Sequence, residues 1–222
     1  MAILRDQLAE LHPRLYHMAE ADSWPSIKRH GLLSTTALLD LFEIGGQPRT
    51  QLERSLRRVS TTITHPIHGT AVLRDQSPMD ENGLIRALTG TGLTPADWLV
   101  MLNRRVFFWL TEERLLRMLS AANYRDSEHL VLVVDTARLL DRHWQNITLS
   151  PINSGATKPM PAPRGAGTFQ SPADFPFDSI AARRRRNDVV VELAVDLAVP
   201  AIDELAVEVR RQQRDAIVAK VT

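Results

Sequence analysis

Two short apolar runs constrain the fold of this chain more than any other feature of its sequence. HLVLVVD (129–135) and VVVELAV (189–195) are short and rich in β-branched residues, which is typical of buried strands. Helical patterns occur elsewhere, but they do not alternate with strand patterns as they would in a doubly wound parallel sheet. The sequence therefore predicts an α+β fold.

Length and charge limit the domain organisation and the partners. The chain has 222 residues, which is enough for one domain, and we predict a single α+β domain over 1–210 with a polar C-terminal tail over 211–222. Its 27 Lys and Arg against 26 Asp and Glu leave a net charge of +1, which argues against a dedicated polyanion binder. Nucleic acid could be contacted through a local patch, such as the four arginines at 183–186. Such a run of like charges is also typical of a solvated face.

Several protein classes do not fit the sequence. The chain has no cysteine, so it has no disulfides, thiolate nucleophiles or cysteine-ligated metals. No apolar run approaches the roughly 20 residues of a membrane-spanning helix. The N-terminal segment MAILRDQLAE places charges where a signal peptide has its apolar stretch. We therefore expect a cytoplasmic protein without a membrane partner.

Capping residues and breakers indicate where the other elements lie. Thr94-Pro95 and Thr111 are typical helix starts, and Gly31 is a typical stop for a helix that begins near Ser23. Short strands are expected at 15–18 and at the aromatic run 106–110, and an extended segment at 60–75. Further helices are expected at 2–11, 35–42, 50–58, 80–89 and 95–104.

Residues 151–180 form an unusual connection between the two apolar runs. The segment holds six of the thirteen prolines and three of the ten glycines, together with Phe169, Phe175 and Phe177. Long loops of this kind often bind partners. One hypothesis for this chain is therefore a non-enzymatic binding domain that recognises a partner through loop 151–180, with these phenylalanines as exposed anchors.

Metal and phosphate motifs are absent from the sequence. His65 and His68 form the one close histidine pair, and there is no HExxH. Neither GxxxxGK[ST] nor GxGxxG occurs, and no GxSxG indicates an α/β-hydrolase. We expect no bound metal.

Glu192 is the most informative single residue because it interrupts an apolar strand. A carboxylate is costly against core or cleft unless it is paired or functional. It could pair with an arginine of 183–186 or lie on the solvated face of an edge strand. Alternatively, it lies in a cleft and stabilises positive charge that develops in a transition state.

His17 and the aromatic strand allow two interpretations as well. His17 is either a half-buried structural residue or a hydrogen-bonding partner of a ribose or phosphate. In the aromatic strand, alternation places Phe107 and Trp109 on one face and Phe108 on the other. Each ring is either core or a surface on which a flat heterocycle stacks.

Three stretches, taken in order, resemble the ADP-ribosyltransferase superfamily and, within it, the DNA-targeting toxins of the DarT type. They are LYHMAEADSWPSIKRHGLLS (15–34), VFFWLTEERL (106–115) and RRRRNDVVVELAVDLAVPAI (183–202). The chain also resembles an uncharacterised bacterial family that shares its PINSGAT and PAPRG stretches. A nucleotide-modifying enzyme of related fold, such as a 2′-phosphotransferase, is a weaker alternative.

The resemblance implies a split two-sheet ADP-ribosyltransferase-like core with peripheral helices and with NAD⁺, a substrate, in its cleft. Tyr16 and His17 would bind NAD⁺, with His17 at a ribose, and Trp109 or Phe108 would stack near the nicotinamide. Glu192 would be the catalytic residue opposing the oxocarbenium-like charge on the ribose. The acceptor of ADP-ribose would be a nucleic acid or a protein. The arginine that grips the pyrophosphate in such toxins has no clear match, the candidates being Arg14, Arg29, Arg49 and Arg164.

Overall fold

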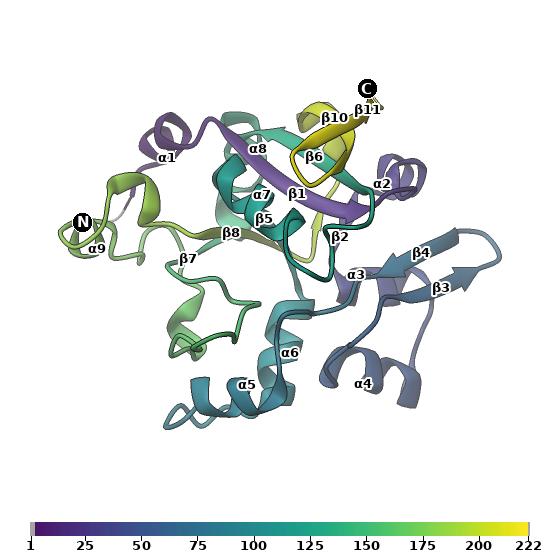
Figure 1. The fold of residues 1–222 in the computed structure, drawn as a ribbon, viewed down its shortest axis with the longest axis horizontal. Helices are drawn as coiled ribbons and strands as arrows, with labels where there is room; N and C mark the ends of the chain where they lie inside the picture. The colour runs from purple at the N-terminus through teal and green to yellow at the C-terminus, as the bar shows by residue number, and fades with distance from the viewer. Residues whose placement is uncertain (1–2, 222) are drawn as a thin grey trace.

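A seven-stranded antiparallel sheet forms the centre of the computed structural model, which describes residues 3–221 (Figure 1). The α+β prediction is confirmed. The first two residues of the predicted domain and the last residue of the predicted tail lie outside the described residues. The strands lie in the order β11 (Ala216–Lys220), β10 (Ala206–Gln213), β6 (His129–Asp135), β1 (Arg14–Glu20), β5 (Arg105–Trp109), β8 (Glu192–Asp196) and β7 (Ile147–Ser150).

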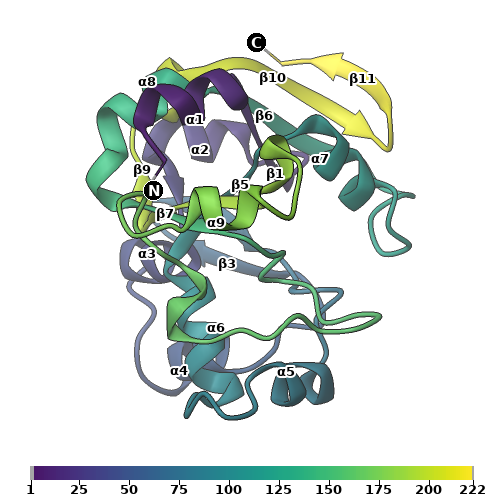
Figure 2. The ribbon, with the colours of Figure 1, turned by 90° about the vertical axis from the view of Figure 1, so that its left-hand side faces the viewer.

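Strand β6 is apolar along its length because helices cover both of its faces. Leu132 and Val134 point into the main core, which includes residues of α1 (Arg5–Leu11), α2 (Trp24–His30) and α8 (Thr136–His143). Val131 and Val133 point to the other face, where they cluster with residues of α7 (Glu112–Leu119). Figure 2 shows α7 on the side of the sheet opposite α1 and α8. A strand buried on two faces needs no polar alternation, which explains the continuous apolar run. None of the helices within residues 3–221 has the length and apolarity to cross a membrane.

The sheet is weakly joined at its middle. Strand β1 pairs with β6 along its whole length, from Arg14 to Glu20, but it pairs with β5 at the single position Tyr16↔Trp109. Strand β5 is paired along its length with β8 on its other side. The facing edges of β1 and β5 therefore part beyond Tyr16.

Residues 35–103 form a helical lobe beneath the sheet (Figure 1). Its apolar residues form two clusters, one around Trp98 and one around Phe42. The predicted start at Thr94 is confirmed, because Thr94 and Asp97 form a reciprocal capping box. The lobe contains α3 (Thr35–Leu41), α4 (Gly46–Arg54), β3 (Thr61–His65), β4 (Gly69–Leu73), α5 (Glu81–Ala87) and α6 (Pro95–Asn103).

Short elements complete the chain. Strands β2 (Leu32–Leu33) and β9 (Ala198–Val199) pair with each other, and β9 lies just after β8. Gly31 precedes β2 with a φ of 81°, and a Cβ there would lie 2.9 Å from the Cα of Pro200, so no larger residue fits. The remaining helices are α9 (Phe177–Ala181), α10 (Ile202–Leu205) and three 3₁₀ turns at Trp144–Asn146, Ala166–Thr168 and Arg186–Asp188.

Loop 151–180 is packed against the body of the protein. Phe169, Phe175 and Phe177 are 8%, 1% and 0% exposed, so the idea that they are exposed anchors is wrong. Phe169 stacks on Trp98 of the lobe with ring centroids 5.6 Å apart, whereas Phe175 and Phe177 enter the main core. The loop uses its aromatic residues to hold itself in place.

Three predicted boundaries differ from the structure. The predicted polar tail is strand, because β10 and β11 form a hairpin at the sheet edge and β11 is exposed throughout. The polar run RRQQRD (210–215) suggested a tail, but the β-branched Ile217 and Val218 that follow it favour a strand. The predicted strand 189–195 begins at Glu192, after a 3₁₀ turn, and the helix predicted at 50–58 is α4, which ends at Arg54.

Candidate functional site

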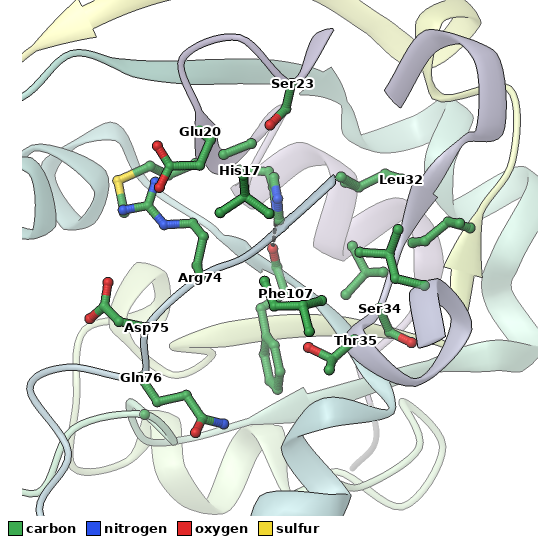
Figure 3. A pocket seen from close by; sticks show the side chains of 18 of the residues that line it. His17, Glu20, Ser23, Leu32, Ser34, Thr35, Arg74, Asp75, Gln76 and Phe107 are labelled. Atoms are coloured by element: carbon green, nitrogen blue, oxygen red, sulfur yellow. Dashed lines mark hydrogen bonds between the residues drawn. The ribbon is translucent and has the colours of Figure 1, made fainter. Parts of the chain in front are cut away.

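A cavity of about 640 Å³, the main cavity, lies between the sheet and the helical lobe (Figure 3). Consecutive residues of two strands line it, 17–20 of β1 and 105–109 of β5, together with residues 70–79 in and after β4. Neighbouring residues of a strand point to opposite faces. A lining of consecutive residues therefore means that the main cavity opens onto the strand edges, at the place where β1 and β5 part.

The imidazole of His17 bridges the gap between β1 and β5. Its Nδ1 lies 2.8 Å from the main-chain oxygen of Phe107, and because that oxygen can only accept, Nδ1 carries the hydrogen (Figure 3). Burial lowers the pKa of His17 to about 4, although the hydrogen bond to Phe107 opposes the change. The ring is therefore neutral near pH 7, with Nε2 left as a hydrogen-bond acceptor in the cavity wall.

Glu192 is the buried carboxylate of the site, with 6% of its surface exposed. Both of its carboxylate oxygens lie 3.1 Å from the main-chain nitrogen of Ser154, which donates to them. Burial raises the pKa of Glu192 to about 7, while the hydrogen bonds from Ser154 and the charge of Arg164 oppose the rise. Near neutral pH this group therefore exchanges between acid and carboxylate.

The structure does not place an arginine of 183–186 against Glu192. The side chain of Arg184 donates to the oxygen of Pro151 at 2.7 Å, and the guanidinium of Arg186 lies over the ring of Phe177. Strand β8 runs between β5 and β7, so Glu192 is not on an edge strand. Its partner is a main-chain donor from loop 151–180, a contact that no sequence pattern signals.

Strand register decides which of the predicted binding residues reach the cavity. Tyr16, Trp109 and Glu192 occupy one row across the sheet, in the pairs Tyr16↔Trp109 and Trp109↔Glu192. Trp109 and Glu192 line the main cavity, and so do His17 and Phe108. Tyr16 shares this row but does not line the cavity, and its ring packs in the cluster beneath α7. Phe108 is 1% exposed, so Trp109 presents more of its ring for stacking.

Arg74 is a residue of the cavity that sequence reasoning missed. It follows β4, lies near His17 and Glu20, and forms no ion pair with a carboxylate among residues 3–221 (Figure 3). Its contacts are with neutral groups, since Nη1 is 3.3 Å from Nδ1 of His129 and the guanidinium lies 5.2 Å from the ring centre of Tyr124. An arginine without a carboxylate partner is suited to bind an anion.

A second arginine of the cavity, Arg57, supports Arg74. Its Nε donates to the oxygen of Arg74 at 3.1 Å, and Nη2 donates to Oδ1 of Asn103 at 3.0 Å. Burial lowers the pKa of Arg57 to about 10, which still leaves it charged near pH 7. Its main-chain nitrogen donates to Gln76, so this one side chain and its backbone hold the stretch 74–76 in place.

None of the four arginines considered for a pyrophosphate lies on the main cavity. Arg14 pairs with Asp135 at 3.0 Å, and Arg49 pairs with Asp40 and Glu53. Arg29 and Arg164 are likewise absent from the lining, and Arg164 is buried in loop 151–180. The cavity arginines are Arg57, Arg74 and Arg105. They follow no recognisable motif, and two of them, Arg57 and Arg74, lie in the helical lobe.

The arginine run contributes to a second, polar cavity of about 360 Å³. Arg185 and Arg186 line it together with Arg114 and Arg117 of α7. Two of these arginines have carboxylate partners, because Arg114 pairs with Asp188 and Arg117 with Glu113. Within the described part of the chain, no group of three or more His, Asp or Glu side chains is placed to hold a metal ion.

The main cavity thus combines an acid whose pKa is about 7, a neutral imidazole acceptor, a guanidinium that contacts neutral groups and a partly exposed indole. This set can hold an anionic ligand with a flat ring and can stabilise a cation next to Glu192. A model of the family of unknown function DUF7002 matches residues 13–206. No curated protein matches the chain.

Proposed function

Because the chain belongs to the DUF7002 family, whose function is unknown, we infer its activity from the main cavity and propose an NAD⁺-dependent ADP-ribosyltransferase-like enzyme. The observation that carries the proposal is that His17, Trp109 and Glu192, which are far apart in the sequence, line one cavity. A volume of about 640 Å³ lies within the usual range of ligand sites, roughly 300 to 1,000 Å³.

In the proposed reaction the bond between the ribose C1′ and the nicotinamide nitrogen breaks. Nicotinamide leaves with the bonding electron pair, and positive charge develops on the ribose. The ionised carboxylate of Glu192, buried and hydrogen-bonded, opposes that charge more strongly than it would in water. An acceptor then attacks C1′ and loses a proton, which completes the transfer of ADP-ribose.

The parting of β1 from β5 supports a split two-sheet core of this type. One group of strands, β11-β10-β6-β1, is joined to the other, β5-β8-β7, through one residue pair. Main-chain groups along the facing edges, where β1 and β5 do not pair with each other, would hydrogen-bond a carboxamide. The indole of Trp109 would stack beside the nicotinamide ring.

Arg74 and His17 would bind the rest of NAD⁺. The guanidinium of Arg74 would contact the pyrophosphate, since it lies near His17 and its contacts among residues 3–221 are with neutral groups. Nε2 of His17 would accept a hydrogen bond from a ribose hydroxyl. The second cavity, with four arginines, favours an acceptor that carries phosphate.

The test is a calorimetric titration with NAD⁺ combined with an assay of nicotinamide release. Glu192→Gln should lower release by on the order of 100-fold or more with little change in the dissociation constant, because the acid acts on the developing charge. Arg74→Gln should instead weaken binding by about tenfold, because it removes a charge-assisted hydrogen bond.

Glu204→Gln is the matched control, because the Glu204 side chain is 59% exposed, its partner is Arg142, and it lines neither cavity. This variant should behave like the wild type in both measurements. The proposal fails if the wild-type protein neither binds nor consumes NAD⁺ at millimolar concentrations.

A further inference from the structure

We propose that Arg164 is a positioning residue that acts on Glu192 through the turn at residues 153–156. The inference rests on the proposed function for its catalytic meaning, but the contacts that carry it are independent of NAD⁺. Arg164 lies in the PAPRG stretch of loop 151–180 and does not line the main cavity.

Arg164 is a buried cation that is held by carbonyl oxygens. It is 3% exposed and makes no ion pair with a carboxylate in the described chain. Nη1 donates to the oxygen of Ser154 at 2.6 Å, Nη2 to that of Ala156 at 2.7 Å, and Nε to that of Ala162 at 3.1 Å. The rigid fork of a guanidinium can make these three bonds at once, which an ammonium cannot match.

Arg164 also ties the loop to the helical lobe. Its main-chain nitrogen donates to the oxygen of Ala87 at the end of α5, and its guanidinium lies 5.6 Å from the ring centre of Trp98 in α6. The turn is thus held from the lobe side of the main cavity, while Glu192 projects from the sheet side.

Ser154 links the two buried charges. Its oxygen accepts from Arg164 and its nitrogen donates to both oxygens of Glu192. Polarisation along this chain of hydrogen bonds strengthens the bond to the carboxylate. The positive charge of Arg164 also favours the ionised form of Glu192. The hydrogen bond from Arg164 to Ser154 and the charge of Arg164 therefore both stabilise the Glu192 carboxylate.

The experiment is a ¹³C NMR titration of the glutamate carboxyl groups, with the Glu192 signal assigned by its loss in Glu192→Gln. Arg164→Gln should raise the pKa of Glu192 by about one unit, because it removes the nearby positive charge. Arg184→Gln is the control, since Arg184 is exposed, binds the same loop at Pro151 and makes no contact with Ser154. Its Glu192 signal should titrate as in the wild type.

Arg164→Lys separates the geometry from the charge and covers the case in which Arg164→Gln does not fold. It keeps the charge but cannot bridge the three carbonyls, so hydrogen exchange of the Ser154 amide should be at least tenfold faster. Exchange of the Leu132 amide in β6 should be unchanged. The inference is overturned if Arg164→Lys leaves Ser154 exchange as in the wild type, or if a folded Arg164→Gln leaves the pKa of Glu192 unchanged.

The activity assay separates a failure of the positioning role of Arg164 from a failure of the proposed function. If Arg164→Gln shifts the titration of Glu192 but no variant consumes NAD⁺, the positioning role stands and the reaction is wrong. If the wild type is active, the ascending limb of its pH profile should move to higher pH in Arg164→Gln, by the same shift as in the NMR titration.

Discussion

Glu192 and His17 carry opposite pKa shifts for the same physical reason. Burial disfavours the charged form of each group, so it raises the pKa of the carboxyl from 4.5 to about 7 and lowers the pKa of the imidazole from 6.5 to about 4. Both shifts therefore favour the neutral forms of these two groups. A ligand that brings both anionic phosphates and a cationic ring would meet complementary groups in the main cavity.

These shifts predict opposite effects of pH on stability. Between pH 4.5 and about 7 the unfolded chain releases the Glu192 proton that the folded chain keeps, so rising pH favours unfolding. The free energy of unfolding of the wild type, relative to Glu192→Gln, should fall by about 3 kcal/mol over this range. Denaturant titrations at several pH values measure it.

The stability of the wild type relative to His17→Gln should change with pH in the opposite direction. Between about pH 4 and 6.5 the unfolded chain binds a proton that the folded His17 does not, so rising pH favours folding, again by about 3 kcal/mol relative to the variant. Flat difference curves for both variants would contradict the burial of these two groups, and Glu204→Gln gives the baseline.

At the scale of elements, the lobe depends on α6, which carries Trp98 and Asn103. Trp98 is fully buried between Phe169 and Arg164, and Asn103 receives a hydrogen bond from Arg57. The capping box at Thr94 determines where this helix begins, and so where both side chains point. The local sequence signal for the start of α6 therefore affects how the wall of the main cavity is positioned.

Thr94→Ala should therefore lower the free energy of unfolding by about 1 kcal/mol, since it leaves the Asp97 main-chain nitrogen without its acceptor. Thr94→Ser keeps the hydroxyl and should stay close to the wild type. Chemical denaturation of the three proteins tests the prediction, which is wrong if alanine and serine are equivalent.

At the scale of the whole molecule, β6 is the structural centre. It pairs with β1 and β10 and contributes to the cores on both faces of the sheet. The strands that carry His17 and Trp109 depend on this centre for their position. A substitution that disrupts β6 should therefore unfold the protein and so remove the main cavity.

Val134→Asp should cost about 4 kcal/mol or more, because Val134 is 0% exposed and the new charge would have no partner. Val207→Asp makes the same change on β10 at a residue that is 44% exposed, and should cost about 1 kcal/mol or less. Thermal unfolding of the two variants compares them. Equal, small losses would show that β6 is not the core strand.

Local patterns predicted most elements of the fold but not how they meet. Thr94, Thr111 and Gly31 marked helix ends correctly because capping depends on neighbours in the chain. The hairpin of β10 and β11 was missed because the polar run 210–215 obscures the short apolar stretch 216–219 that follows it. The apolar residues 189–191 did not signal that β8 starts at Glu192, since burial alone does not distinguish strand from extended loop.

The sequence by itself determined an α+β protein with buried apolar strands and singled out His17, Trp109 and Glu192, since residue type and spacing are local properties. The tertiary structure decided that these residues line one cavity and that Tyr16 does not, because the cavity opens where β1 and β5 part, beyond Tyr16. It also placed Arg74 beside His17 and the Ser154 amide against Glu192. Such contacts join segments that are distant along the chain, and only the packing of the whole molecule brings them together.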